Sequence, residues 1–173
     1  FGVTGSMELP AIAEALAKPG VNTTAALFAF ALILIALAFK LGAAPFHLWI
    51  PDVYQGAPTP VTAFLSVGSK AAAAVVTLRL VSPFLASTPL VGKVTAVLAI
   101  VAILTLLVGN LAALPQKNFK RLLAYSSVGH SGFLLMALAA APRVSVENAM
   151  SPATVVGFYL GAYLLMTLLA FLN

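Results

Sequence analysis

The sequence contains no cysteine and little charge, and each shortage excludes a class of protein. Without cysteine the chain forms no disulfide, ligates no iron–sulfur cluster through thiolates and uses no cysteine nucleophile. Only 8% of the residues are charged, whereas soluble domains carry roughly a quarter. Hydrophobic residues make up 62%, so too few polar groups remain to cover a globule in water. The composition predicts an integral, multi-pass membrane protein.

The charges that do occur are mostly positive. Nine Lys and Arg face four Asp and Glu, which gives a net charge of +5. These residues are spread over expected loops and helix ends, and no basic run is long enough to bind nucleic acid. We therefore interpret them as topology charges. The cluster Lys117, Lys120 and Arg121 favours a cytoplasmic position for its end of the bundle, although four basic residues lie near the other end.

Apolar segments of membrane-spanning length recur along the chain. Each is close to the 20 or so helical residues that cross a hydrocarbon core of about 30 Å. The breaks between them are rich in Pro, Gly, Ser and Asn. The apolar runs are continuous and lack the alternation of a membrane β-barrel. The sequence predicts an all-α polytopic bundle in one membrane domain, with helices at about residues 24–44, 62–81, 94–114, 119–141 and 153–172.

Residues 46–54 form a segment too short to span a membrane alone. The segment begins after Pro45, which suits the first turn of a helix. It is either an interfacial helix with Trp49 and Tyr54 in the aromatic belt, or the continuation of the helix at 24–44. In the second case one discontinuous membrane helix is broken near Gly42 and Pro45, and we expect unsatisfied carbonyls beside Lys40. Such backbone persists only when it is buried in protein or lines water.

Two lysines fall inside or at the edge of expected membrane helices. A lysine at the membrane centre costs on the order of 2.5 to 3.5 kcal/mol on insertion scales, so a lysine that persists there is usually paired, hydrated or functional. Lys40 lies near a helix end, where it could also extend its ammonium to the headgroups. Lys70 lies midway along its helix, so that explanation does not apply to it. We expect both lysines to be buried and functional.

Polar residues accompany Lys70 along one stripe of its helix. At 100° per residue the stripe covers an arc of about 100° on an otherwise apolar helix, so it should face the bundle interior. Its hydroxyl groups can hydrogen-bond water beside the ammonium. The stripe consists of Thr62, Ser66, Ser69, Lys70 and Thr77.

The helix that begins at Phe119 repeats this pattern within an arc of about 140°. Ser126, Ser127, His130 and Ser131 share one side of it. Histidine changes its protonation near neutral pH and suits proton transfer, although a buried histidine satisfied by a hydroxyl is an equally good explanation. Together with the two lysines these residues predict a path for protons or cations.

A carboxylate partner for the lysines is missing from the expected spans. Glu8, Glu14 and Glu147 fall in expected loops, and Asp52 falls at the far end of the short segment. If the path exists, we expect its carboxylate on helices outside this chain.

Other polar and small residues have simpler explanations. Gly157 and Gly161 form a Gly-x-x-x-Gly pair that favours close helix packing. Gly109 and Asn110 are interpreted as a helix cap. His47 and His130 could ligate a haem between facing helices, as in a b-type cytochrome, and a haem Soret band would test that alternative. No other residues suggest a metal or cofactor site.

Two long motifs give the chain a family resemblance. PFHLWIPDVYQGAPTPVTAFLSVGSKAAA (residues 45–73) and GNLAALPQKNFKRLLAYSSVGHSGFLLMAL (residues 109–138) closely resemble the subunit N family of bacterial proton-pumping NADH–quinone oxidoreductase, respiratory complex I. The similarity extends along essentially the whole chain. Related antiporter-like subunits occur in multisubunit cation/proton antiporters and membrane-bound hydrogenases, which remain alternatives.

The resemblance implies roles for single residues. Lys40 matches the channel lysine at the break of a discontinuous helix, which includes Gly42 and Pro45, and Lys70 matches the lysine that passes the proton onward. His130 falls in the family's Tyr-Ser-Ser helix, which is associated with the central hydrophilic axis. The expected proton path comprises Lys40, Lys70, His130, Ser66, Ser127 and Ser131.

The resemblance also implies a setting for the chain. We expect the central part of a longer subunit in the bacterial cell membrane, built from inverted repeats, with the loop PQKNFKR in the cytoplasm. Its partners would be antiporter-like neighbours, quinone-module subunits and lipid. NADH, FMN, iron–sulfur clusters and quinone would all be bound by other subunits.

Overall fold

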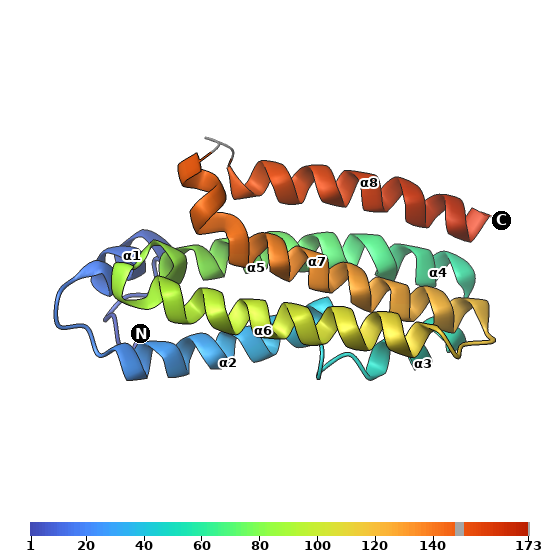
Figure 1. The fold of residues 1–173 in the computed structure, drawn as a ribbon, viewed down its shortest axis with the longest axis horizontal. Helices are drawn as coiled ribbons and strands as arrows, with labels where there is room; N and C mark the ends of the chain where they lie inside the picture. Colours follow the sequence, from blue (N-terminus) through green and yellow to red (C-terminus); the bar gives the residue numbers. More distant parts are fainter. Residues whose placement is uncertain (148–150, 173) are drawn as a thin grey trace.

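The computed structural model describes residues 1–147 and 151–172, and every element in these residues is a helix. The longest helices lie side by side along one axis (Figure 1). The elements are α1 (Leu9–Ala17), α2 (Thr23–Leu41), α3 (Trp49–Gly56), α4 (Thr59–Phe64), the π-helix η1 (Leu65–Ser69), α5 (Lys70–Ala86), α6 (Thr88–Ala113), α7 (Phe119–Glu147) and α8 (Pro152–Leu172).

Within the described residues five helical spans are long and apolar enough to cross a membrane, which confirms the predicted all-α bundle. One of them, Thr59–Ala86, joins α4, η1 and α5 into a span of 28 residues. It is longer than the expected 62–81, and α6 begins at Thr88 instead of near residue 94. Residues 82–93 were expected as a loop because of their prolines. Pro89 lies in the first turn of α6, where a helix tolerates proline.

The first helix, α1, was not expected. Glu14 was assigned to a loop but lies within α1, whose N-cap is Glu8; Glu147 is likewise the last residue of α7. Leu16 of α1 is only 1% exposed, and its carbonyl accepts a hydrogen bond from Ser87 Oγ at 2.7 Å. This contact ties α1 to the junction between α5 and α6.

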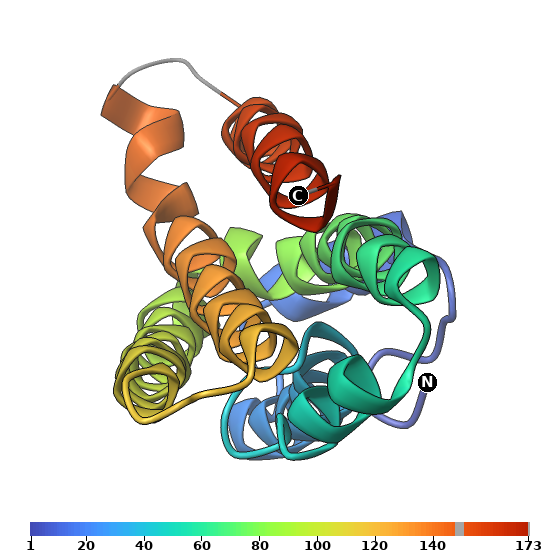
Figure 2. The ribbon, with the colours of Figure 1, turned by 90° about the vertical axis from the view of Figure 1, so that its right-hand side faces the viewer.

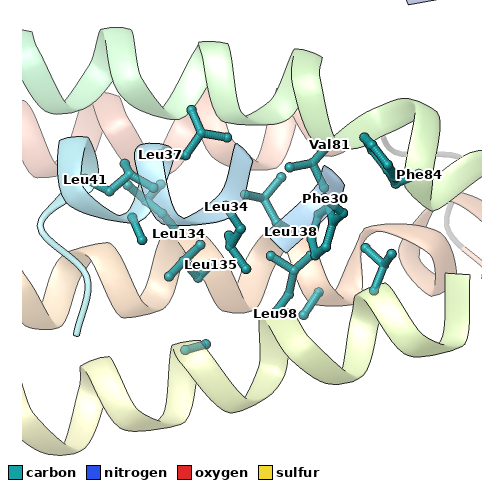
Figure 3. Packing of buried hydrophobic residues seen from close by; sticks show 14 of the residues in the cluster. Phe30, Leu34, Leu37, Leu41, Val81, Phe84, Leu98, Leu134, Leu135 and Leu138 are labelled. Carbon is teal, nitrogen blue, oxygen red and sulfur yellow. The ribbon is translucent and has the colours of Figure 1, made fainter. Parts of the chain in front are cut away.

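The core is an apolar cluster between α2, α5, α6 and α7 (Figure 3). The buried positions of α2 recur every three or four residues, as expected for one face of a helix. Phe30 of that face meets Phe84 of α5 with ring centroids 5.2 Å apart. Figure 3 shows how Leu134, Leu135 and Leu138 of α7 complete the cluster.

Helices α6 and α7 approach each other closely at Gly109. A Cβ on Gly109 would lie 2.6 Å from the backbone nitrogen of Gly129 and 2.9 Å from its Cα. Gly109 and Asn110 therefore do not form the expected cap: both lie within α6, and Asn110 Nδ2 donates to the Leu106 carbonyl of the same helix at 2.8 Å. Small residues permit this backbone contact, which side chains would prevent.

The second glycine pair behaves differently. A Cβ on Gly157 or Gly161 of α8 would meet nothing within 4 Å. The expected close packing at this pair thus has no partner helix among the described residues. Figure 2 shows α8 (red) beside α4 and α5, with α7 (orange) on its other side.

The chain breaks between α2 and α3 in the way a discontinuous helix requires. Gly42 has φ 72° and ψ 38°, and Ala43 N–H donates to the Ala38 carbonyl at 2.8 Å, which closes α2 with a left-handed cap. Glycine suits this position because of its positive φ; a Cβ there would also lie 1.8 Å from Ile50 Cδ1, a side-chain end that would have to shift. Beyond the break α3 continues in the general direction of α2 (Figure 1).

The polar backbone at this break is satisfied by neighbouring helices. Ser131 Oγ of α7 donates to the Leu41 carbonyl at 2.6 Å, and Thr105 Oγ1 of α6 accepts from Ala44 N–H at 3.0 Å. Trp49 Nε1 donates to the Phe39 carbonyl at 3.2 Å. We expected unsatisfied carbonyls beside Lys40, but those of the flanking residues Phe39 and Leu41 are paired. The break spans residues 42–48, so α3 begins later than residue 46.

Gly109→Ala should destabilise the bundle, because its methyl group would meet backbone atoms of Gly129 that cannot rotate away. We expect a loss of about 1 to 3 kcal/mol, the usual cost of overpacking. Thermal unfolding of the purified protein measures the change. Gly161→Ala is the control, since its methyl group has free space; equal midpoints for the two variants would contradict the packing argument.

Thr105→Val should weaken the break while preserving shape, because the Ala44 N–H loses its acceptor in a buried position. An unsatisfied buried donor costs about 1 to 3 kcal/mol. Hydrogen–deuterium exchange at residues 42–48 should accelerate in the variant. Thr105→Ser keeps the hydroxyl and should exchange as the parent does; similar exchange in the valine variant would show that Thr105 does not hold the break.

Candidate functional site: a buried lysine beside a serine and three tyrosines

Lys70 lies at the point where the π-helix η1 ends and α5 begins. Its side chain is only 4% exposed, as expected for the polar stripe. Thr62, Ser66 and Thr77 of that stripe are buried as well, while Ser69 is half-buried. A π-helical turn adds a residue relative to an α-helix and is frequent at functional sites.

The Lys70 ammonium is held by a single residue of α7. Its Nζ donates to the backbone carbonyl of Ser127 and, at 2.6 Å, to the Ser127 hydroxyl. The same hydroxyl lies 3.2 Å from the Tyr54 hydroxyl and 3.2 Å from the Tyr163 hydroxyl. A hydroxyl accepts two hydrogen bonds and donates one. Ser127 can therefore accept from Lys70 and Tyr163 and donate to Tyr54, so all its bonding capacity is used.

His130 lies one turn further along α7, against α8. Its Nδ1 is 2.5 Å from the Tyr159 hydroxyl, and its ring centroid is 4.5 Å from that of Tyr163. The Lys70 Nζ lies 5.6 Å from the centre of the Tyr163 ring, within the range of a cation–π contact. Tyr163 therefore contacts Lys70, Ser127 and His130 at once. The lysine and the histidine belong to one connected group of side chains.

A cavity of about 130 Å³ adjoins this group between η1, α7 and α8. Its polar lining consists of Ser66, Ser126, Tyr163 and Thr167. A site of this volume with several hydroxyl groups has room for more than one hydrogen-bonded water molecule. Ser66 Oγ donates to the Ala63 carbonyl at 2.8 Å and can still accept from water.

An ionic contact at the end of the bundle fixes α3 against α7. Arg121 Nη1 lies 2.6 Å from Asp52 Oδ1 and 3.0 Å from Gln55 Oε1, and Lys120 Nζ donates to the Ala57 carbonyl at 2.9 Å. Since α3 also carries Tyr54, this attachment helps to hold the Tyr54 hydroxyl near Ser127. The only carboxylate in an ion pair among the described residues is thus at the bundle end, away from Lys70.

The structure brings some of the predicted site residues together and separates others. Lys70, Ser127 and His130 form one group, Ser66 lines the adjoining cavity, and Ser131 binds the broken helix whose turn contains Gly42 and Pro45. Lys40 was expected to be buried, but its side chain is exposed. Lys40 is exposed because it does not belong to the face of α2 that packs into the core.

Several residues of the site were missed at the level of sequence. Tyr159 and Tyr163 are four apart on α8 and therefore share a face, a signal that was available. Tyr54 was assigned only to a membrane-interface belt, yet it is 2% exposed. His47 was considered only as a haem ligand. It is 8% exposed, and its Nδ1 is a buried side-chain atom without a hydrogen-bond partner in the described part of the chain.

The described side chains do not assemble a metal centre of three ligands. Residues 1–147 and 151–172 contain no group of three His, Asp or Glu side chains placed to hold a metal ion. For the haem alternative, His130 would have to present a nitrogen to iron from one side. Its Nδ1 is engaged by Tyr159, so Nε2 is the nitrogen that would bind iron, and the Soret band remains the test of that alternative.

Comparison with known proteins matches the sequence to one family. The family profile described as NADH:quinone oxidoreductase/Mrp antiporter, transmembrane, covers residues 1–173. NADH-quinone oxidoreductase subunit N of Rhodococcus opacus is 47% identical over 99% of the chain, and that of Halorhodospira halophila is 44% identical over 99%. These matches cover only 30% and 33% of the two relatives.

Solved structures give the same result. A chain of respiratory complex I from Thermus thermophilus is 42% identical over 98% of this chain, with a TM-score of 0.67. A chain of the membrane-bound sulfane sulfur reductase, an archaeal respiratory membrane complex, is 28% identical over 99% with a TM-score of 0.79. In each case 33% of the matched chain is covered. The chain spans about a third of the length of its relatives, and it belongs to the NADH:quinone oxidoreductase/Mrp antiporter transmembrane family, as an antiporter-like membrane segment of the subunit N type.

Proposed function

We propose that this chain forms part of the proton path in a membrane subunit of NADH–quinone oxidoreductase, with Lys70 as the residue that loads and releases the proton. Ser127 holds Lys70, and His130 is the next titratable group in the connected cluster. Ser66 and the adjoining cavity would supply hydrogen-bonded water. The proposal assigns proton translocation to the chain and leaves redox chemistry to other subunits.

The observation that carries the proposal is a buried ammonium whose partners are all neutral. Within the described residues Lys70 bonds the carbonyl and hydroxyl of Ser127 and faces the Tyr163 ring, but it meets no carboxylate. Oxygen acceptors of this kind can hydrogen-bond a charged ammonium or a neutral amine. A fixed carboxylate would stabilise the charged form alone. The site therefore suits a lysine that must exist in both protonation states.

Lys40 has a different place in the proposal. It lies in the last turn of α2, next to the break, and its side chain points out of the described bundle. An exposed ammonium in a membrane span requires water, headgroups or an acidic partner. We propose that Lys40 exchanges protons with a carboxylate on a helix outside this chain. We include in the same path His47, which lies within the break and whose buried Nδ1 has no hydrogen-bond partner in the described residues.

The relatives support a proposal for the setting of the chain. Because the matched proteins are subunits of NADH-quinone oxidoreductase, we propose that the chain acts in the bacterial cell membrane beside other membrane subunits of that complex. NADH, FMN, iron–sulfur clusters and quinone would be bound by those partner subunits. Under this proposal Lys117, Lys120 and Arg121 face the cytoplasm.

A second assembly is favoured by one observation. The backbone superposes on the archaeal sulfane sulfur reductase chain with a TM-score of 0.79, higher than for the complex I chain. A subunit of a related respiratory complex or cation/proton antiporter would use a similar buried lysine. The proteins that co-purify from native membranes discriminate between these assemblies, because only complex I brings NADH- and quinone-binding subunits.

Lys70→Ala in the full-length subunit should reduce proton pumping by at least about tenfold per assembled complex, since the alanine cannot carry a proton. Pumping is measured in membrane vesicles from the quenching of a pH-sensitive dye during NADH oxidation. Lys93→Ala removes an exposed lysine of α6 and should pump as the parent does. Normal pumping by the Lys70 variant at normal assembly would refute the role of Lys70.

Ser127→Ala tests the support of Lys70. The variant removes the hydroxyl that binds Lys70, Tyr54 and Tyr163, while the backbone carbonyl remains as an acceptor. We expect pumping to fall by about three- to tenfold, which corresponds to about 0.7 to 1.4 kcal/mol, the usual net contribution of one hydrogen bond, because the carbonyl still accepts from Lys70. Ser82→Ala, at an exposed serine of α5, is the control. If both variants pump alike, Ser127 does not support the lysine.

A further inference from the structure

The contact between His130 and Tyr159 is not explained by the path proposed above. His130 Nδ1 lies 2.5 Å from the Tyr159 hydroxyl, which is a short hydrogen bond between α7 and α8. The second ring nitrogen, Nε2, has no hydrogen-bond partner among the described residues. The two nitrogens of one imidazole are therefore in different situations. Only one of them is free to exchange a proton.

A phenol can hold Nδ1 in both charge states of the histidine. A protonated imidazolium carries hydrogen on both nitrogens, so its Nδ1–H must donate to the Tyr159 oxygen. A neutral imidazole that keeps its hydrogen on Nδ1 makes the same bond and leaves the Nε2 lone pair free. One hydrogen bond thus serves both states without rearrangement. In the other tautomer Tyr159 would donate to Nδ1, and that bond would have to reverse at each protonation.

The surroundings hold the ring and the phenol in place. His130 packs on Tyr163 at 4.5 Å between centroids, and its ring lies 5.9 Å from that of Tyr159 and 6.2 Å from that of Phe133. Phe133 and Tyr159 are themselves 6.3 Å apart. Aromatic contacts on several sides restrict rotation of the imidazole. The direction of Nε2 is therefore set by the packing of α7 against α8.

We infer that Tyr159 is a positioning residue that keeps the hydrogen of His130 on Nδ1 and so makes Nε2 the nitrogen that accepts and releases the transported proton. The inference rests on the proposed function, because it assumes that His130 takes part in the path. No atom is consumed: Nε2 binds a proton, the imidazolium forms, and the same proton leaves Nε2 to the next acceptor. Tyr159 keeps its own proton throughout.

Tyr159→Phe in the full-length subunit of the assembled complex tests the inference. The ring contacts remain and only the oxygen is lost. We expect pumping per assembled complex to fall by about five- to tenfold, as for loss of one buried hydrogen bond. The solvent deuterium isotope effect on pumping should rise, because proton transfer at His130 becomes slower than the other steps. A purely structural role would not change that isotope effect.

Two comparisons make the test specific. Phe158→Leu removes an exposed ring from the same helix, next to Tyr159, without touching a hydrogen bond, and it should leave pumping and the isotope effect unchanged. In the His130→Gln background Tyr159→Phe should cause no further loss, because Tyr159 acts through the histidine. If the phenylalanine variant assembles poorly, Tyr159→Gln and Tyr159→Met replace it. They are similar in size, and only Gln carries an acceptor oxygen, so Gln should pump faster.

The outcomes separate the inference from the proposal beneath it. Parent-like pumping and an unchanged isotope effect in Tyr159→Phe overturn the inference. If Lys70→Ala still shows a large loss of pumping, the proposed function stands. An additive loss in the double variant, or equal rates for Gln and Met, also overturns it. Parent-like pumping in Lys70→Ala removes the proposed function, and the inference with it.

Discussion

The rest of the structure depends on hydrogen bonds made by the hydroxyl groups of Ser127 and Ser131 on α7. A membrane span has no water in the hydrocarbon core, so every interruption of a helix must be satisfied by another helix. Ser131 donates to the Leu41 carbonyl, where α2 breaks before α3. Ser127 accepts from Lys70, where the span from α4 to α5 passes through a π-helical turn. One helix therefore binds a polar group of each irregular span, and it does so with residues one turn apart.

This arrangement explains why α7 needs such close neighbours. It is the most buried of the five spans, and the glycine contact with α6 at Gly109 brings the backbones together. That contact also brings Thr105 of α6 to the break, where it accepts from Ala44 N–H. At the bundle end, Arg121 holds Asp52 of α3. An exposed ion pair contributes little stability, about 0 to 1 kcal/mol, so its main effect is to fix the position of α3 and Tyr54. Close packing of the helices is therefore what brings the hydrogen-bonding groups within reach of one another.

Much of the site could be anticipated from spacing alone. The polar stripe of Lys70 and the row of Ser127, His130 and Ser131 both follow from the helical period, and the structure places them inward. The tyrosines of α8 could not be found in this way, because an aromatic residue in an apolar helix looks like core or interface until its neighbour is known. Lys40 shows the opposite error. Its place at a helix break suggested burial, but burial depends on which face of α2 meets another helix.

The sequence by itself determined that this protein lies in a membrane and that it is helical there. With 62% hydrophobic residues and 8% charged ones, the chain requires a membrane, and segments of about 20 apolar residues require helices there. Only the tertiary structure decided how the isolated charge is accommodated. A sequence can show that Lys70 must have partners, but hydrogen bonds between helices depend on distances of a few tenths of an ångström. The packing of α3, α7 and α8 around Ser127 sets those distances.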